Sequence, residues 1–354
     1  MEVVKKTHSK KIIGARLDIK NGKIDLTHGS GGRAMNQLID QLFIPAFKNP
    51  WLDRKDDQAC ISVNKGRMVI ATDAHVISPL FFPGGTIGSL AVHGTINDIA
   101  MAGATPLHLT ASFILEEGLP LADLEKIVIS MAEAAHAANV TIIAGDTKVV
   151  EHGKGDKIFI TTTGIGFVTE GIFLSPEKIK PNDHIIVNGY IGDHGIAIMA
   201  HRNNLQFQTS LQSDTAALHD LVALMIAAAP NLRCLRDPTR GGLATVLNEW
   251  STQYQVGFYL EETKIPVRAE VMGACELLGL DPLYVANEGK LVAICPPEES
   301  EQLIAAMHQH PLGQAAAIIG HATSDEPHFV QLKTKFGGIR NVDWLVGEQL
   351  PRIC

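Results

Sequence analysis

Short apolar runs rich in β-branched residues alternate with amphipathic helical patterns along this chain, and this alternation constrains the fold more than any other feature of the sequence. Runs that predict strands lie at 68–72, 141–145, 158–168 and 184–189. Segments that predict helices lie at 33–43, 86–102, 121–138, 214–229, 243–255 and 298–309. A mixture of both kinds of element predicts an α/β or α+β protein.

A turn-rich segment, SPEKIKPND at 175–183, divides this pattern near the middle of the 354 residues. Such a concentration of turn formers is typical of a domain boundary, and a chain of this length is typical of two domains. We therefore expect four parts: an N-terminal extension at 1–23, a first domain at 24–170, a second domain at 171–347 and a C-terminal tail at 348–354.

The charge and hydropathy of the chain exclude two classes of partner. The formal net charge is −8 and no long run of Lys or Arg occurs, so a nucleic-acid-binding surface is not expected. No apolar stretch approaches the ~20 residues of a membrane span, and the start of the chain lacks the apolar core of a secretory signal. We expect no nucleic acid, no membrane and a cytoplasmic location.

The five cysteines predict no structural cross-link, because they are odd in number and form no CxxC pair. Cys275 and Cys295 lie in apolar surroundings typical of a core. Cys354 differs, since it is the last residue and nothing can pack beyond it. A thiol in such an exposed place is open to oxidation unless it has a role.

Acidic residues gather at the expected edges of elements in the first half. They are Asp56 and Asp57 in KDDQAC, Asp73 in ATDAH, Asp98 after Asn97, and Asp146 in AGDTK. Asp73 and Asp146 each follow an apolar run, where a side chain can point into a crevice. Mg²⁺ takes oxygen ligands, usually one or two carboxylates with phosphate oxygens. The set therefore predicts a metal–triphosphate site.

Two further features are typical of a nucleotide site. His93 and Asn97 are four residues apart on the expected helix 86–102, so they share a face beside Asp98. The segment HGSGGR at 28–33 precedes another expected helix, where Gly-rich backbone presents N–H donors that suit phosphate. The GK[ST] ending of a Walker A loop is absent, and no GxGxxG follows a strand, so a dinucleotide fold is not favoured.

Together these motifs resemble the HypE family of hydrogenase maturation factors, which belongs to the PurM-like (aminoimidazole-ribonucleotide-synthetase-like) ATP-binding proteins. The resemblance extends from about Ile24 to Cys354. The motifs that carry it are HGSGG (28–32), ATD (71–73), FFPGG (81–85), GTINDIAMAGATP (94–106), FILEEGLP (113–120), GDTKVV (145–150), GDHG (192–195), RDPTRGGL (236–243), ANEGK (286–290) and PRIC (351–354).

The resemblance implies a two-domain PurM-like fold with a flexible C-terminal tail, a homodimer formed through the N-terminal domain, and ATP and Mg²⁺ as cofactors. It implies that a carbamoyltransferase, HypF, places a carbamoyl group on the sulfur of Cys354. The chain would then use ATP to dehydrate this thiocarboxamide to a thiocyanate. The cyano group would pass to a HypC–HypD iron scaffold complex and become a cyanide ligand of [NiFe]-hydrogenase.

This chemistry gives roles to particular residues. Phosphorylation of the amide oxygen would turn it into a good leaving group, and the amide nitrogen would lose a proton to a base. Cys354 is then the attachment point, Glu288 the candidate base and Lys148 the candidate cation. Candidate nucleotide contacts are His28, Gly29, Ser30, Gly31, Gly32, Asp73, His93, Asn97, Asp98, Asp146 and Thr147. Candidate metal ligands are Asp56, Asp57, Asp73, Asp98 and Asp146, with no choice made between Asp56 and Asp57, and candidate residues of a tail or substrate channel are Arg240, Gly241, Gly242, Asn287 and Arg352.

Two other hypotheses remain. The first is another PurM-like ATP enzyme that acts on a free small molecule, such as a phosphoribosyl amide or a thiamine phosphate. That hypothesis leaves the terminal LPRIC without an explanation. The second is a tail-docking adaptor with a structural ATP site. Such an adaptor would bind ATP without releasing phosphate when its tail is carbamoylated.

Overall fold

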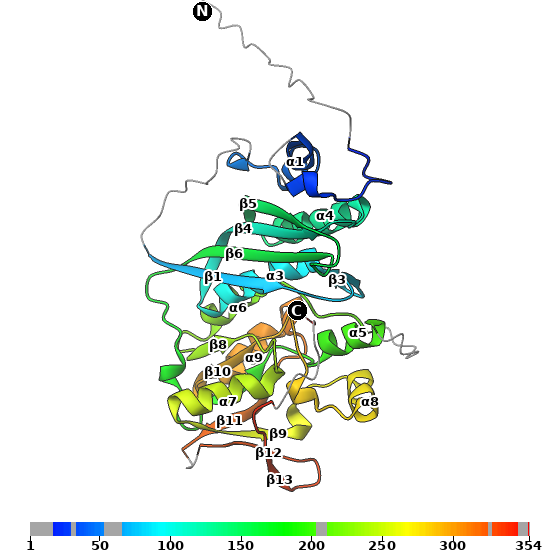
Figure 1. The fold of residues 1–354 in the computed structure, drawn as a ribbon. Helices are drawn as coiled ribbons and strands as arrows, with labels where there is room; N and C mark the ends of the chain where they lie inside the picture. Colours follow the sequence, from blue (N-terminus) through cyan, green and yellow to red (C-terminus); the bar gives the residue numbers. More distant parts are fainter. Residues whose placement is uncertain are drawn as a thin grey trace, which may run out of the picture.

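The computed structural model describes residues 17–29, 33–52, 66–202, 211–324, 328–345 and Ile353. Two α/β halves lie one above the other in Figure 1, each built on its own sheet. The expected mixture of helices and sheets in two halves is therefore confirmed. Among the described helices, none is both long and apolar enough to cross a membrane.

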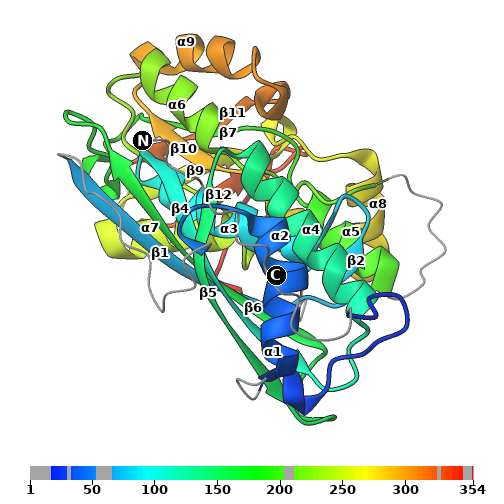
Figure 2. The ribbon, with the colours of Figure 1, turned by 90° about the horizontal axis from the view of Figure 1, so that it is seen from above.

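The first half is built on a four-stranded sheet with the order β1-β6-β4-β5. The strands are β1 (Arg67–His75), β4 (Ala104–Glu116), β5 (Thr141–Val150) and β6 (Ile158–Val168), and only the β4–β5 pair is parallel. Helices α3 (Ile87–Met101) and α4 (Leu121–Ala137) pack together against one face, which we call the inner face. Figure 2 shows the short helices that lie beside α4: α1 (Arg33–Leu38), the π-helical turn η2 (Ile39–Phe43) and α2 (Ile44–Phe47).

The inner face is apolar because side chains alternate between the two sides of each strand. Leu109, Ala111, Phe113 and Leu115 of β4 are buried against the helices, while Ile114 between them is exposed. A hairpin of β2 (Phe81–Phe82) and β3 (Gly85–Thr86) leads into α3, and Thr86 caps that helix through the N–H groups of Gly88 and Ser89.

The second half is built on a seven-stranded sheet with the order β13-β12-β9-β11-β7-β10-β8. Its helices are α5 (Asp193–Arg202), α6 (His219–Ala228), α7 (Gly242–Tyr254), α8 (Ala269–Leu278) and α9 (Pro297–Met307). Its strands are β7 (His184–Val187), β8 (Cys234–Arg236), β9 (Gly257–Glu261), β10 (Val292–Cys295), β11 (Ala317–Thr323), β12 (Val330–Lys333) and β13 (Ile339–Asn341).

Both faces of this second sheet are covered by helices. Ile185 and Val187 of β7 pack in a core with Trp250 of α7, whereas Ile186 packs in a separate core with Leu221 of α6. Burial on both sides explains why the strand at β7 appears in the sequence as a continuous apolar run.

Each predicted helix and strand has a counterpart, but several elements were not predicted. They include β4, the short strands β2 and β3, the short helix α2, α5, α8 and the strands of the second half other than β7. The helix predicted at 214–229 begins only at His219, because the preceding residues form a connecting segment between the halves. The last part of the N-terminal extension expected at 1–23 is attached to the first half: Lys23 pairs with Pro120, and Leu17 packs against the core.

Candidate functional site

Carboxylates from both halves meet beneath the inner face of the first sheet. We call Asp73 of β1, Asp98 of α3, Asp237 after β8 and Glu288 before β10 the inner acidic cluster. The negative charges of Asp73 and Asp237 raise the pKa values of both Asp98 and Glu288, and the charge of Asp73 also raises the pKa of Asp237. The four carboxylates therefore lie close enough to repel one another. Arg240 partly balances this charge, with its Nη2 atom 3.5 Å from Asp73 Oδ1.

Repulsion and burial strongly perturb two members of the cluster. Burial, and then the charges of Asp237 and Asp73, raise the pKa of Asp98 to about 7. The same kinds of effect, with burial the largest and Asp214 next, raise the pKa of Glu288 well above its usual range. Glu288 is only 4% exposed, and its Oε1 atom has no hydrogen-bond partner among the described residues. Such groups mark a functional site and would be stabilised by a cation.

The cluster suits a cation that is also held by a substrate. Within the described ranges, no group of three or more His, Cys, Asp or Glu side chains is placed to hold a metal ion. The excess of buried negative charge nevertheless favours a positive ion there. Phosphate oxygens and water would have to complete its coordination, as is usual for Mg²⁺.

The connections between the halves fix the position of Glu288. Its N–H donates to Asp214 Oδ1 at 3.0 Å, and its carbonyl oxygen accepts from the amide of Asn97 at 3.0 Å. Asn97 also donates to the carbonyl of Ala216 and accepts from the N–H of Leu218. Helix α3 therefore holds the segment that carries Glu288 through the side-chain amide of Asn97, whose nitrogen and oxygen both form hydrogen bonds.

His93 and Asn97 thus contact the second half of the chain itself. His93 Nδ1 is 3.0 Å from Thr215 Oγ1, and burial lowers the pKa of His93 to about 4, so the ring is neutral. The buried polar residues that suggested a nucleotide from the sequence have protein partners here. Their assignment as nucleotide contacts stays a prediction.

Asp146 does not lie with Asp73 and Asp98, and the expectation that all three converge within one chain was wrong. Both Asp73 and Asp146 lie inside strands rather than after them. The register pairs Asp73 with Thr162 and, across the sheet, with Ala111 and Gly145. Asp146 is one residue further, so it points to the other, outer face. Lys148 lies on that outer face too, 3.4 Å from Asp146 Oδ2.

The start of the glycine-rich segment, at His28 and Gly29, lies in a turn against β5, the strand that carries Asp146. The 3-10 turn η1 (Leu26–Gly29) contacts β5, and the ring of His28 accepts a hydrogen bond from Asp25 N–H. A small, largely apolar cavity of about 130 Å³ lies next to it, between the N-terminal helices and β5. Its walls are Met35, Ile39, Phe43, Ile44, Phe47, Leu52, Ala111, Phe113, Ile142, Ala144, Gly145, Asp146 and Thr147.

Of the residues expected to form a tail channel, Arg240 pairs with Asp73 of the inner acidic cluster and Asn287 directly precedes Glu288. Gly241 and Gly242 both have positive φ values at the start of α7, and a Cβ on Gly241 would be 3.6 Å from Leu345, the last residue described before the tail. Asn287 serves as a structural bracket, since its side chain bonds Gly192, Pro238 and Val285. Its role toward a substrate stays a prediction.

The end of the chain returns to the boundary between the halves. Ile353 is 5% exposed, forms an isolated β-bridge with Ile77, and belongs to the same apolar core as Ala286. Figure 1 shows the C-terminus between the upper and lower sheets. The tail was expected to be flexible, yet the one tail residue described is buried and its carbonyl is hydrogen-bonded to His194.

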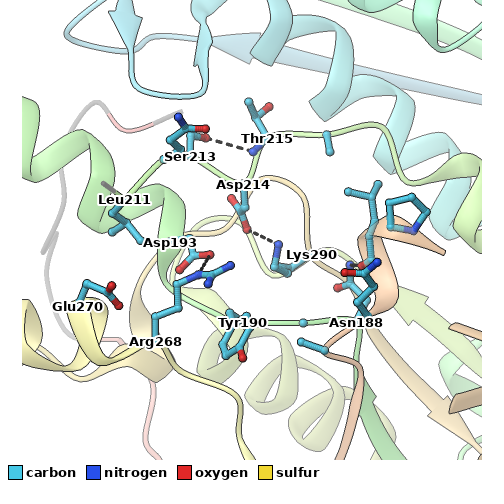
Figure 3. Close-up of a pocket in the computed structure, with 17 residues that line it drawn as sticks. Asn188, Tyr190, Asp193, Leu211, Ser213, Asp214, Thr215, Arg268, Glu270 and Lys290 are labelled. Carbon is cyan, nitrogen blue, oxygen red and sulfur yellow. Dashed lines mark hydrogen bonds and ion pairs between the residues drawn. The ribbon is translucent and has the colours of Figure 1, made fainter. Parts of the chain in front are cut away.

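A larger cavity of about 580 Å³ lies beside this region in the second half. Figure 3 shows its charged walls, where Arg268 pairs with Asp193 at 2.9 Å and Lys290 pairs with Asp214 at 3.0 Å. Arg268 also covers the ring of Tyr190. Asp193 and Asp214 were not singled out from the sequence, and neither was Asp237. The sequence signals that could have indicated them were the motif GDHG for Asp193 and the motif RDPTRGGL for Asp237. Asp214 lies in neither motif.

Seven of the expected site residues lie outside the described residues: Ser30, Gly31, Gly32, Asp56, Asp57, Arg352 and Cys354. Their roles stay predictions.

Comparison with known proteins identifies the class to which this fold and site belong. Residues 55–168 match the N-terminal domain of AIR synthase related proteins, and residues 180–333 match the C-terminal domain. The expected PurM-like fold is thereby confirmed.

More similar relatives define the family within that class. The chain is 62% identical to carbamoyl dehydratase HypE of Azotobacter vinelandii over 96% of its own length and 100% of that protein. A crystal structure of hydrogenase maturation protein HypE in complex with ATP superimposes with a TM-score of 0.89 at 46% identity, over 93% of this chain and 99% of that one. A HypE–HypF complex matches with a TM-score of 0.77 at 46% identity, over 87% and 99%. The chain belongs to the HypE family.

Proposed function

We propose that this chain uses ATP to dehydrate a carboxamide on the sulfur of Cys354 to a thiocyanate, which supplies cyanide ligands for [NiFe]-hydrogenase maturation. Family membership supports the reaction, since the relatives are named carbamoyl dehydratases. The observation that carries the proposal for this chain is the link between buried Ile353 and the segment of Glu288: the Ile353 carbonyl bonds His194, and the next residue, Gly195, donates to Ala286. We infer that the tail thereby carries its cysteine toward the buried carboxylate.

The reaction can be written so that every atom is accounted for. The amide oxygen attacks the γ-phosphorus of ATP, ADP leaves, and the nitrogen gives up one proton. The C–O bond of this O-phosphorylated intermediate then breaks and phosphate leaves, while the nitrogen gives up its second proton and the C≡N bond forms. The amide oxygen therefore leaves in inorganic phosphate and not as water. The protein must bind phosphate, balance its charge and supply a base.

Glu288 is the proposed base. A carboxylate takes a proton best when its pKa lies near the working pH, and burial among other carboxylates raises the pKa of Glu288 in that direction. A magnesium ion, when bound, would supply positive charge for the phosphates at the inner acidic cluster. Asp73 and Asp98 are the described residues that would hold it, with Asp56 and Asp57 as the remaining candidates.

The nucleotide requires an apolar site for its base and donors for its phosphates. The 130 Å³ cavity beside β5 has largely aliphatic and aromatic walls, and the turn η1, which begins the glycine-rich segment, also contacts β5. We propose that adenine enters this cavity. The phosphates would then extend toward the glycine-rich segment.

A homodimer would explain why candidate residues lie on both faces of the first sheet. The outer face exposes Met68, Ile70 and Ile114, and Thr72 bonds Thr163 across it. Pairing of two copies through this face would bury these side chains. Asp146 and Lys148 of one copy would then lie at the interface, available to the site of the other.

We further propose two partners and a location for the chain. The partners are a carbamoyltransferase of the HypF kind, which donates the carbamoyl group, and a HypC–HypD iron scaffold, which accepts the cyano group; the location is the cytoplasm. The HypE–HypF complex among the structural relatives supports the first. The scaffold rests on the family resemblance, and the location rests on the sequence features given above.

The decisive experiment is the intact mass of the chain after incubation with the carbamoyltransferase, carbamoyl phosphate and ATP. We expect a carbamoyl group on Cys354, followed by loss of the mass of water. Cys354→Ala should bind ATP and accept no carbamoyl group. Glu288→Gln should accept it but dehydrate ~10²–10⁴ times more slowly, so the thiocarboxamide accumulates.

Each result also separates the alternatives. An adaptor would leave the carbamoylated mass unchanged in the wild-type chain. An enzyme for a free small molecule would take no carbamoyl group at Cys354 at all. Thiocyanate formed at the normal rate by Glu288→Gln would remove Glu288 as the base.

A further inference from the structure

A buried histidine holds the end of the tail. His194 lies in the first turn of α5 and is completely buried. Its Nε2 atom is 2.6 Å from the main-chain oxygen of Ile353, and its Nδ1 atom is 2.7 Å from Ser213 Oγ. Phe82 packs edge-on against the ring, with the two centroids 5.8 Å apart. The imidazole is thus fixed by contacts on both nitrogens and on its edge.

These contacts determine which nitrogen carries the proton. A carbonyl oxygen only accepts, so Nε2 of His194 must donate to Ile353. Nδ1 of the neutral ring then accepts from the hydroxyl of Ser213. That hydroxyl oxygen accepts in turn from the N–H of Thr215 at 3.1 Å. The chain of bonds is fully satisfied only while Ile353 is in place.

The tail residue is seated on both halves of the molecule. Ile77, which pairs with Ile353, belongs to the first half, and His194 belongs to the second. The N–H of Ser213 also donates to Pro83 in the turn between β2 and β3, which joins the same halves. Docking of the tail therefore depends on the closed arrangement of the two halves.

The residues that hold Ile353 are also hydrogen-bonded, through their neighbours in the chain, to the segment that carries Glu288. Asp214 follows Ser213 and accepts the N–H of Glu288 at 3.0 Å. The N–H of Gly195, next to His194, donates to Ala286 at 3.1 Å. Figure 3 shows Ser213, Asp214 and Thr215 in sequence along one wall of the larger cavity. The histidine and Glu288 are thus held by two shared segments.

We propose that His194 is a positioning residue that docks the tail: its Nε2–H holds the Ile353 carbonyl and thereby keeps the end of the chain at the segments that also bond the Glu288 loop. Release of the tail toward a carbamoyl donor breaks this bond and leaves a buried N–H without an acceptor. Loss of one buried hydrogen bond shifts such a docking equilibrium by about tenfold. The inference rests on the proposed function only for the use of the docked thiol, since docking itself involves neither ATP nor a partner.

Two substitutions distinguish the contribution of Nδ1 of His194 from that of Nε2. His194→Asn keeps a polar group near the Nδ1 position for Ser213 but has no donor that reaches Ile353. His194→Gln places its amide near the Nε2 position and keeps that donor. In the free, full-length chain without ATP, iodoacetamide should alkylate Cys354 about tenfold faster in His194→Asn than in the wild type. His194→Gln should remain close to the wild type, with Cys354 followed by peptide mass spectrometry.

Equal alkylation of Cys354 in all three chains would overturn the proposal. A measurement on the wild type covers the case in which His194→Asn does not fold. Nitrogen-15 NMR of labelled histidines should show a slowly exchanging Nε2–H for His194, assigned by its loss in His194→Gln. In a chain that ends at Leu345, this proton should exchange faster and its resonance should shift. An unchanged signal would overturn the proposal equally.

Turnover distinguishes positioning from a general structural role. His194→Asn should accept a carbamoyl group at the wild-type rate or faster, yet dehydrate it about tenfold more slowly. Equal slowing of both steps would reduce His194 to a structural residue. If alkylation differs as expected while the wild type forms no thiocyanate, docking stands and the proposed function fails.

Discussion

At the scale of single residues, the site is defined by carboxylates that the fold forces together. Asp98 lies on a helix of the first half and Asp237 follows a strand of the second, so no local sequence feature brings them into contact. Their mutual repulsion, added to burial, opposes ionisation of Asp98. A cation bound among these carboxylates would relieve the repulsion.

The pKa of Asp98 predicts a pH-dependent stability difference. The folded carboxyl has a pKa of about 7, above its ordinary value of 3.8, so the native state retains a proton that the unfolded chain loses. Its unfavourable contribution is therefore absent below pH 3.8 and grows as pH rises to about 7. In metal-free urea titrations, the free energy of unfolding of Asp98→Asn minus that of the wild type should increase between these pH values.

The matched control is Asp123→Asn, which removes an exposed carboxyl from the first turn of α4. We expect no comparable rise there. A pH-independent difference for Asp98→Asn would mean that Asp98 is ionised in the folded chain throughout this range.

At the scale of elements, helix α3 joins the halves. One of its sides packs on the inner face of the first sheet, and Asn97 forms three hydrogen bonds to the connecting segments of the second half. The helix thereby positions Asp98 and Glu288 relative to each other. Gly94 allows this close packing, because a Cβ there would lie 2.8 Å from His75 Nε2.

Asn97→Ala should destabilise the chain by about 2 to 4 kcal/mol, because it leaves a buried N–H and two buried carbonyls without partners. Urea unfolding measures this. Asn231→Ala is the control, since its side chain bonds only the exposed Glu299, and we expect a change within about 0.5 kcal/mol. A loss below about 1 kcal/mol for Asn97→Ala would show that water replaces the lost amide.

At the scale of the whole molecule, the outer face of the first sheet is the surface that a second copy would cover. Met68 and Ile70 are 50% and 57% exposed on β1, on the side opposite α3 and α4. Exposed apolar side chains in a row on a sheet face favour association.

Ile70→Asp should therefore convert a dimer to a monomer, because a carboxylate buried in an apolar interface is costly. Light scattering at micromolar concentration measures the mass. Leu277→Asp is the matched control: it is 69% exposed on α8 of the other half, and the mass should not change. A wild-type chain that is monomeric at that concentration would contradict the assembly itself.

Much of the fold could be predicted from the sequence because its signals are local. Strands β1, β5, β6 and β7 and helices such as α3 and α4 follow from apolar periods that neighbouring residues define. Family motifs added the fold and the reaction. The long strand β4 was missed because its polar outer residues and Pro106 obscure the strand pattern.

The sequence by itself determined the two α/β halves, most of their helices and strands, and the choice of Cys354 and Glu288 as the residues to examine. Only the tertiary structure decided which faces these elements present. Asp146 and Asp73 both lie in strands, but a one-residue offset across paired strands places them on opposite sides of the sheet. Contacts between distant segments were equally inaccessible: Asp237 meets Asp98, and His194 meets Ile353, because packing of the two halves brings together residues that no local pattern relates.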